Sequence, residues 1–235
     1  RVVVVLLALV ASAAADSLLL RRMHFVEKNE HGNMLFRGNE PVNEEEEKFA
    51  FDALVRDMRV IAKKENVTMP SDFLLVDISF LNPNTTSPDE HDLNLEEGFA
   101  KTGDAVKFMR ITLLGDTLVP SFQDQISAIQ HARTLPKWQV DKLPSRIEKL
   151  RKIMTTKGDR PTVVYAHCEQ GIDRTGEFIG SYSLRYLNKT WPEVQRTNFD
   201  VAHRRPMQKH QFSLVWYCLW LQVSGIRPDL DCFSA

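Results

Sequence analysis

The residues that could do chemistry in this chain are concentrated in one stretch, VVYAHCEQGIDRTGEF, which covers residues 163–178. A β-branched run leads into a loop that holds Cys168 and, six positions later, Arg174. A loop between a strand and a helix points several backbone N–H groups into one space, where the helix dipole adds partial positive charge. A guanidinium grips two phosphate oxygens at once, and the same field stabilises a cysteine thiolate. The stretch therefore predicts a phosphate site with its own nucleophile.

Other interpretations of this loop fail on detail. Gly171 and Gly176 give the spacing G-x-x-x-x-G, but Glu177 follows where a P-loop nucleotide-binding protein has lysine. No second cysteine stands at the spacing of a redox pair. His167 and Cys168 are neighbours on an extended chain and point apart, so we expect no metal ligands here. An inert, half-buried cysteine would leave the arginine and the glycines unexplained.

The loop resembles the signature of the cysteine-dependent protein tyrosine and dual-specificity phosphatase superfamily, in which five residues separate His-Cys from Arg-Thr. Weaker matches accompany it. MLFRGNEP resembles an Arg-Ser-x-x-Pro element near the start of compact dual-specificity-like members, and LLVDIS and KFMRITLLGDT resemble the two strands that precede their acid loop. RTGEFIGSYSLRYLNKTWPEV resembles the helix that follows their signature loop, so the resemblance covers residues 24–223.

This resemblance implies a role for each residue of the loop. Cys168 would be the nucleophile that forms a phosphocysteine intermediate, and Arg174 would hold the phosphoryl oxygens. Thr175 would donate its hydroxyl to the departing sulfur, and His167 would orient the loop and favour the thiolate. Backbone N–H groups would line the phosphate-binding cradle, and they belong to Glu169, Gln170, Gly171, Ile172, Asp173 and Arg174.

The leaving group also needs a proton, which an aspartate on a separate loop normally supplies. Asp116, in LLGDTL, is the first candidate because it follows a strand that we expect to end beside the cradle. Asp173 is the alternative, since members whose loop has the sequence Asp-Arg-Thr, including lipid phosphatases of the myotubularin type, are thought to use that position. Asp124 is better explained as the helix-capping partner of Ser121.

Charge around the loop bears on the substrate. Glu169 and Asp173 would repel a highly anionic ligand, whereas inositol-lipid members often carry lysines inside the loop. We therefore expect a phosphorylated protein, phosphotyrosine above all, or a small phosphomonoester, hydrolysed without metal or other cofactor. A phosphoinositide or inositol phosphate phosphatase and an inactive phosphate-binding module are the alternatives. The segment HRRPMQKHQ is expected to form the substrate rim, through Arg204, Arg205 and Gln208, with Lys209 and His210 beside them.

The chain as a whole has an ordinary globular composition. Of its 235 residues, 43 % are hydrophobic and 26 % charged, with a formal net charge of −1. This balance gives no indication of a nucleic-acid partner. Strand-like and helix-like segments alternate without an internal linker, which predicts a single domain over residues 16–235. The predicted fold class is α/β, with a central, mostly parallel sheet flanked by helices.

Hydrophobic periodicity places the elements along the chain. Strands are predicted over residues 23–28, 33–38, 73–80, 105–114 and 161–166. Helices are predicted over residues 41–64, from Ser121 onward, over 144–156 and over 212–223. A further helix is predicted from the end of the Cys168 loop to near Trp191. Residues 82–92 are predicted to form a polar loop. Glu44–Glu47 should fall in the first turn of the first helix. Capping pairs are expected at the start of two later helices: Ser121 with Asp124, and Ser145 with Glu148.

The first residues, RVVVVLLALVASAAAD, have the layout of a secretory signal peptide, with small residues before Asp16. We expect cleavage near Ala15, which makes residues 1–15 a leader. The alternatives are a membrane anchor and a buried strand, but the apolar run is too short to span about 30 Å of hydrocarbon. The chain is thus expected to be secreted or to lie in an endomembrane lumen, with no stable membrane span. Three glycosylation sequons agree with this, at Asn66, Asn84 and Asn188.

Two of the three cysteines, Cys218 and Cys232, lie close together near the C-terminus. An oxidising compartment would permit a disulfide between them that pins the tail. The alternative is a buried helical Cys218 with an exposed thiol at Cys232.

Overall fold

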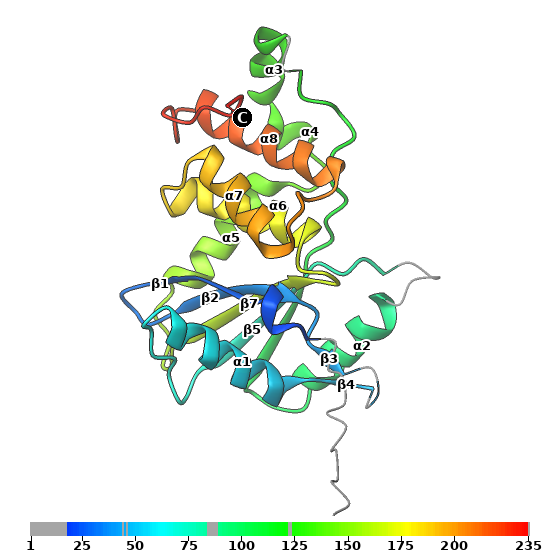
Figure 1. Cartoon of the computed structure of the whole chain (residues 1–235), viewed down its shortest axis with the longest axis vertical. Coiled ribbons are helices and arrows are strands. Elements are labelled where there is room, and N and C mark those ends of the chain that lie inside the picture. Colours follow the sequence, from blue (N-terminus) through cyan, green and yellow to red (C-terminus); the bar gives the residue numbers. More distant parts are fainter. Residues whose placement is uncertain (1–17, 44, 46, 84–88, 122–123, 235) are drawn as a thin grey trace, which may run out of the picture.

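A computed structural model describes residues 18–234 except 44, 46, 84–88 and 122–123. The signal peptide expected over residues 1–15 and the sequon at Asn84 lie outside these residues. A central sheet separates two groups of helices (Figure 1), so the fold class is α/β as predicted. Among the described residues, no helix combines the length and the apolar character needed to cross a membrane.

The main sheet has five strands in the order β1-β2-β7-β5-β6. Only the β1–β2 pair is antiparallel, which confirms the prediction of a mostly parallel sheet. The central strand β7 is buried along its whole length, as its β-branched sequence favours. The strands are β1 (His24–Lys28), β2 (Met34–Asn39), β5 (Leu74–Ser79), β6 (Val106–Arg110) and β7 (Thr162–Cys168), and a separate antiparallel pair is formed by β3 (Val42–Asn43) and β4 (Lys48–Phe49).

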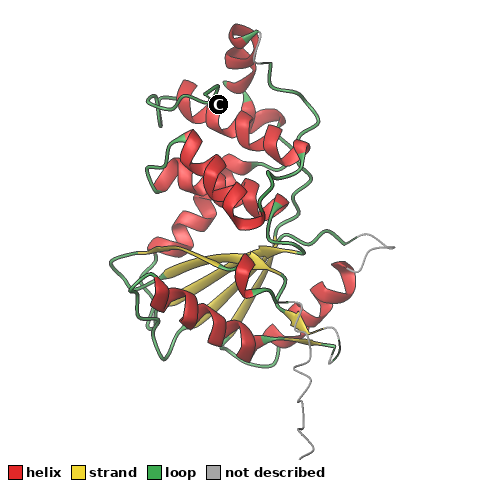
Figure 2. Ribbon diagram, in the orientation of Figure 1, coloured by secondary structure: helices red, strands yellow, loops and turns green. Residues whose placement is uncertain are grey.

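Helices cover both faces of the sheet (Figure 2). One face carries α1 (Phe51–Lys64), with α2 (Asp89–Ala100) beside it, and the other carries a stack of helices. The stack consists of α3 (Gln125–Ala132), α4 (Leu135–Trp138), α5 (Leu143–Thr155), α6 (Asp173–Tyr186), α7 (Trp191–Ala202) and α8 (Gln208–Val223), and a short 3-10 helix, η1 (Leu20–Arg22), precedes β1.

The sheet divides the hydrophobic core in two, and β7 contributes to both parts. Val163 and Tyr165 pack toward α1, whereas Val164 and Cys168 belong to the core beneath the helical stack. Because side chains alternate along a strand, His167 lies on the side of α1 and α2, opposite Cys168. The expectation that these two neighbours point apart is confirmed.

Two predictions about the first half of the chain are wrong. The first helix begins at Phe51 and not near residue 41, because the preceding residues form the β3–β4 pair. Glu44–Glu47 therefore precede the helix, and Asp52 is the acidic residue of its first turn. Residues 89–92 of the expected polar loop are the first turn of α2, a helix that the sequence analysis did not predict.

One predicted capping pair is present in part and the other is absent. The Ser121 hydroxyl accepts a hydrogen bond from the Asp124 N–H at 2.8 Å, but Asp124 is itself the N-cap of α3, where its carboxylate accepts from the Ser127 N–H. Ser145 lies inside α5 and donates to the Lys142 carbonyl, so it does not cap with Glu148. The helix after the loop ends at Tyr186, and a capping box at Thr190 begins α7 before the pair Trp191-Pro192.

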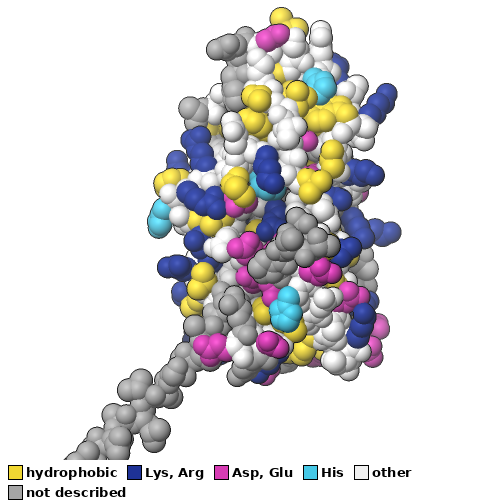
Figure 3. Space-filling model, turned by 90° about the vertical axis from the view of Figure 1, so that its right-hand side faces the viewer, with side chains coloured by type: hydrophobic (Ala, Val, Ile, Leu, Met, Phe, Trp, Pro, Cys, Tyr) yellow, Lys and Arg dark blue, Asp and Glu magenta, His cyan; other side chains and the backbone are white. Residues whose placement is uncertain are grey.

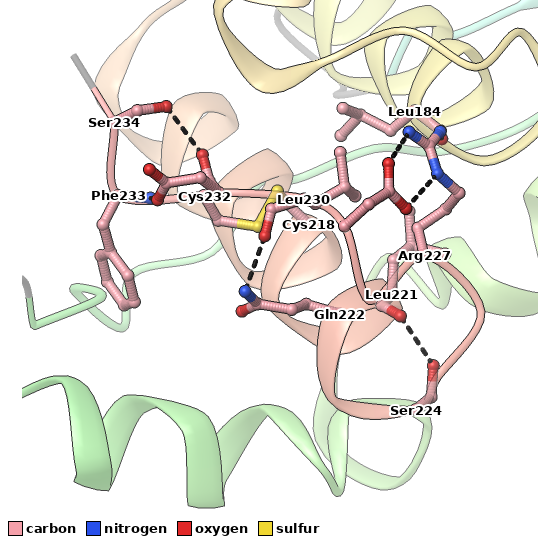
Figure 4. Close-up of a disulfide and its surroundings, with 12 residues drawn as sticks. Leu184, Cys218, Leu221, Gln222, Ser224, Arg227, Leu230, Cys232, Phe233 and Ser234 are labelled. Atoms are coloured by element: carbon pink, nitrogen blue, oxygen red, sulfur yellow. Dashed lines mark hydrogen bonds and ion pairs between the residues drawn. A yellow bond between two sulfur atoms is a disulfide. The ribbon is translucent and has the colours of Figure 1, made fainter.

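A disulfide joins Cys218 in α8 to Cys232, with Cα atoms 5.8 Å apart (Figure 4). Gln222 donates to the Leu230 carbonyl, and Arg227 donates to the Leu184 carbonyl of α6. The tail after α8 is thus fastened to the helical stack at several points, and the expected pairing is confirmed. Closing a loop of this length contributes about 3 kcal/mol to the free energy of unfolding.

Candidate active site

The loop after β7 is fixed by its close approach to β2. Gly171 has φ +67°, and a Cβ there would lie 2.5 Å from the carbonyl carbon of Gly38, so only glycine fits. The guanidinium of Arg37 is buried and donates to the Gly171 carbonyl at 3.1 Å and to Asn198 at 2.8 Å. The amide of Asn198 in turn donates to the Gly176 carbonyl. The loop is therefore clamped from β2 and α7.

Cys168 ends β7 at the base of this loop, and its side chain is buried with 2 % exposure. The Gly171 N–H donates to the Cys168 carbonyl, which closes the loop into a tight turn. Glu169 and Gln170 are exposed, whereas Ile172 and Asp173 are buried at the start of α6. The loop thus connects the buried sulfur directly to the N-terminus of a helix, where anions are favoured.

Arg174 lies in the first turn of α6 and is held in place by neighbouring oxygens. Its Nη1 donates to the Phe80 carbonyl at 3.0 Å and to the Asp89 carboxylate at 2.8 Å. The Glu169 carboxylate lies 3.8 Å from Nη2. Burial alone would lower the pKa of Arg174, but the Cys168 sulfur and Asp89 raise it above its ordinary value. The guanidinium is therefore a permanent cation close to the Cys168 sulfur.

Thr175 and Asp116 were both expected to assist the chemistry, and both are buried. The Thr175 hydroxyl has no hydrogen-bond partner among the described residues, which leaves it available to a sulfur or phosphate ligand. Asp116 lies 4 % exposed in the segment between β6 and α3, where it accepts a hydrogen bond from Gln139 at 3.0 Å. Burial raises the pKa of Asp116, so it retains its proton to higher pH than an exposed aspartate.

The segment around Asp116 is tethered to the helical stack. The Leu114 and Gly115 N–H groups donate to the two oxygens of Asp141, at 2.8 and 2.7 Å. The Asp116 N–H donates to the Lys209 carbonyl at the start of α8. The carboxyl group of Asp116 is thus carried by a loop with a fixed backbone, which runs up the right side of the molecule in Figure 1.

Asp173 has a different environment from Asp116. Arg204 donates to both of its oxygens, and the Met207 N–H donates to one of them at 2.6 Å. Burial opposes ionisation of this carboxyl group, but these hydrogen bonds lower its pKa below the ordinary value. Asp173 is therefore a carboxylate that anchors the segment after α7 to the cradle.

The residues expected at the substrate rim separate into two groups. Arg204 reaches the cradle through Asp173, whereas Arg205 and Gln208 line a hollow of about 530 Å³ together with Trp191 and Phe212. Figure 3 shows the face that carries the loop between β6 and α3, with most hydrophobic side chains on its upper half and acidic ones around its middle and lower half. The exposed hydrophobic residues on this loop are Leu114, Leu118 and Val119.

His210 also lies near the cradle, but it is buried and paired. Its Nδ1 lies 2.6 Å from Glu177 Oε2. Burial lowers the pKa of His210 to about 4 and raises that of Glu177 well above its ordinary value, the latter with help from Asp141. Burial thus favours the neutral form of both groups, and His210 is paired with Glu177 inside the protein.

His167 contacts two carboxylates on the far side of the sheet. Its Nε2 lies 3.0 Å from Asp77 Oδ1 and 3.5 Å from Glu96 Oε1, and all three side chains are fully enclosed. Burial raises the pKa of Glu96 well above its ordinary value, and the nearby Asp77 raises it further. His167 is thus held from the side of the sheet opposite Cys168.

Several residues of the site escaped the sequence analysis. Asp89 holds Arg174, Asn198 clamps the loop, and Asp77 with Glu96 surrounds His167. The sequence did indicate Arg37, because this residue lies in the stretch MLFRGNEP, which resembles an element of the phosphatase superfamily. The others come from α2, α7 and the middle of β5, and no local motif marks them.

No protein-family model matches the chain, and no curated protein matches it by sequence. Solved structures with a similar fold include human DUSP28, at 12 % identity and a TM-score of 0.37, covering 82 % of this chain and 91 % of that one. A mouse putative dual specificity phosphatase complexed with zinc tungstate is 16 % identical, with a TM-score of 0.37 and coverages of 86 % and 91 %. PTPMT1 in complex with PI(5)P is 13 % identical, with a TM-score of 0.36 and coverages of 86 % and 97 %.

Proposed function

We propose that this chain is a cysteine-dependent phosphatase that hydrolyses phosphomonoesters through a phosphocysteine intermediate. The observation that carries the proposal is the position of Cys168 and Arg174 at the two ends of one clamped turn between β7 and α6. The helix N-terminus and the guanidinium both favour a dianion there, and the same positive field favours a thiolate. No step of the chemistry requires a metal ion or another cofactor.

The reaction has two steps. In the first, the Cys168 sulfur bonds to phosphorus, and the ester oxygen departs with a proton from Asp116. In the second, water gives a proton to the Asp116 carboxylate and displaces the sulfur, which releases inorganic phosphate and restores the acid, with Thr175 donating a hydrogen bond to the departing thiolate. Arg174 and the loop N–H groups hold the phosphoryl oxygens throughout. Asp116 is favoured as the acid because its pKa is raised, whereas hydrogen bonds keep Asp173 ionised.

The substrate class that we propose is a phosphorylated protein, with phosphotyrosine first, or a small monoester with a single phosphate. Two carboxylates, Asp89 and Glu169, lie beside Arg174 and would repel a ligand with several phosphates. This observation disfavours inositol phosphates and phosphoinositides. The proposed substrate class would be supported if the chain hydrolysed phosphotyrosine peptides in preference to a panel of phosphoinositides and inositol phosphates.

We further propose that the chain works in the secretory pathway or outside the cell. The disulfide between Cys218 and Cys232 supports an oxidising compartment. Two of the sequon asparagines, Asn66 and Asn188, are exposed residues in left-handed turns, accessible to glycosylation. Expression in a cell with a secretory pathway tests this, through recovery of the chain from the medium and its mobility shift after glycosidase treatment.

The experiment that tests the phosphatase proposal is the Cys168→Ser variant. Serine is nearly isosteric but far less acidic, so turnover of phosphomonoesters should fall below detection while vanadate still binds. Undiminished turnover by this variant would end the cysteine mechanism. If the unaltered chain binds vanadate but hydrolyses none of a broad panel of monoesters, the chain is an inactive phosphate-binding module instead.

A further inference from the structure

Three side chains of the kinds that bind metal ions meet in the core beneath α2. Asp77 extends from β5, Glu96 from α2 and His167 from β7, and one donor atom of each lies within 4.8 Å of the other two. The exposed fractions are 0 %, 1 % and 0 %. The three residues come from distant parts of the chain and converge on one point.

The rest of the protein satisfies few of these donor atoms. The Ser79 side chain favours the ionised form of Glu96, but among the described residues no partner forms a well-aligned hydrogen bond with the Asp77 carboxylate or with either ring nitrogen of His167. No lysine or arginine of the described chain pairs with the two carboxylates in the structure. Buried polar groups are normally hydrogen-bonded, and buried charges are normally paired or bound to metal.

We propose that Asp77, Glu96 and His167 bind one divalent transition-metal ion, zinc first. Zinc takes nitrogen and carboxylate ligands at about 2.0–2.1 Å in a tetrahedral arrangement, which separates neighbouring donor atoms by about 3.3 Å. The observed separations from His167 Nε2 are 3.0 and 3.5 Å. Two carboxylates and a neutral imidazole also balance the charge of a dication. Magnesium fits less well, because it prefers all-oxygen octahedral sites that keep several waters.

The site explains how α2 is held against the catalytic loop. Asp89, which binds Arg174, begins α2, and Glu96 stands two turns later on the same helix. His167 immediately precedes Cys168 on β7. A metal ion joining Glu96 to His167 would therefore fix the helix that orients Arg174 to the strand that carries the nucleophile. The ion lies across the sheet from the sulfur, so it stabilises the site and takes no part in phosphoryl transfer.

Zinc binding is best measured on the full chain carrying Cys168→Ser, because the thiolate could itself bind zinc. We expect one zinc ion per chain after dialysis into metal-free buffer, and a lower melting temperature after removal by chelator that zinc restores and magnesium does not. Glu96→Gln should weaken zinc binding at least about 10-fold. Glu97→Gln is the matched control, since Glu97 neighbours it on α2 but is exposed and pairs with Lys101. Equal zinc affinity in the two variants would overturn the proposal.

A second measurement needs no change to the three ligands. Cobalt(II) added to the metal-free Cys168→Ser chain should give the intense visible absorption of a four- or five-coordinate site, saturating at one equivalent and displaced by zinc. The weak spectrum of hexaaquo cobalt throughout the titration would overturn the proposal, whether or not Glu96→Gln folds. Neither result affects the phosphatase proposal, which depends on turnover by the chain with Cys168 intact.

Discussion

Arg204 holds Asp173 through both of its terminal nitrogens, at 2.8 and 2.9 Å. The pair joins the segment after α7 to the first residue of α6, where the phosphate-binding loop ends. The Met207 N–H adds a third hydrogen bond to the same carboxylate. An aspartate in this position serves the loop as an anchor, which is why we propose Asp116 in preference to Asp173 as the acid.

Replacing Arg204 with alanine should therefore loosen the loop. We expect a higher KM for phosphomonoesters and weaker vanadate binding, with a coupling energy of about 1 kcal/mol in a double-mutant cycle with Asp173→Asn. The magnitude is modest because the Arg204 side chain is 44 % exposed. Arg196→Ala is the control, since Arg196 is an exposed arginine on α7 that does not contact Asp173 in the structure. An equal rise in KM for both variants would show that general charge, and not the anchor, is responsible.

The two candidate acids predict opposite dependences on the leaving group. Asp116→Asn should slow phosphotyrosine hydrolysis by about 10²–10⁴-fold, and esters with acidic leaving groups much less. Burial raises the pKa of Asp116, and an acid must be protonated to act, so wild-type activity should fall as pH rises through that pKa. The variant should lose this basic limb. Asp173→Asn should weaken binding without dependence on the leaving group, and the reverse pattern would make Asp173 the acid.

The ion pair between Asp89 and Arg174 provides a third prediction. Asp89→Asn removes the charge that holds the guanidinium, so the KM for phosphomonoesters should rise several-fold while the fold is retained. Phosphate inhibition constants and kcat/KM measure the effect. Glu90→Gln is the matched control, because Glu90 follows on the same helix and is exposed. Unchanged phosphate affinity in Asp89→Asn would mean that the Phe80 carbonyl alone positions Arg174.

Glu177 should make the folded chain sensitive to alkaline pH. Its pKa in the folded state is raised above the ordinary 4.5 by burial and by Asp141, so its stabilising contribution is complete below pH 4.5 and declines as pH rises. Glu177→Gln should thus gain stability relative to the wild type with rising pH, by at most about 1.4 kcal/mol per pH unit. Urea unfolding of both proteins at several pH values measures this difference in the free energy of unfolding. Glu65→Gln, at an exposed position, should show no such trend.

The part of the site that the sequence predicted is local. Cys168, Arg174 and the glycine between them stand on one strand–loop–helix turn, whose pattern of β-branched residues, glycines and helical spacing lies within a short window. The expectation for Asp116 depended only on its place after a strand parallel to β7. Such proximity is expected from strand direction, because parallel strands end at the same edge of the sheet. The role of Asp116 stays a prediction.

Of the site residues that the sequence did not predict, Asp89, Glu96 and Asn198 lie on α2 and α7. The buried face of α2 consists of Asp89, Leu93 and Glu96, so two of its three buried residues are carboxylates and no apolar period marks the helix. Asn198 is likewise a polar residue on a buried helix face. Periodicity detects hydrophobic burial, and it fails where polar groups are buried to hold a site. The Glu44–Glu47 run misled in the opposite direction, because charge suited to a helix start stands in the connection between β3 and β4.

The most direct measurement is capture of the intermediate on Cys168. Rapid acid quench of the unaltered chain during turnover of a phosphotyrosine peptide, followed by peptide mass mapping, should find one phosphoryl group on the peptide that contains Cys168. The adduct should accumulate when the second step is slowed by Thr175→Ala and should be absent from Cys168→Ser. Turnover with no phosphorylated peptide under these conditions, or with the phosphoryl group on another residue, would contradict the proposed mechanism.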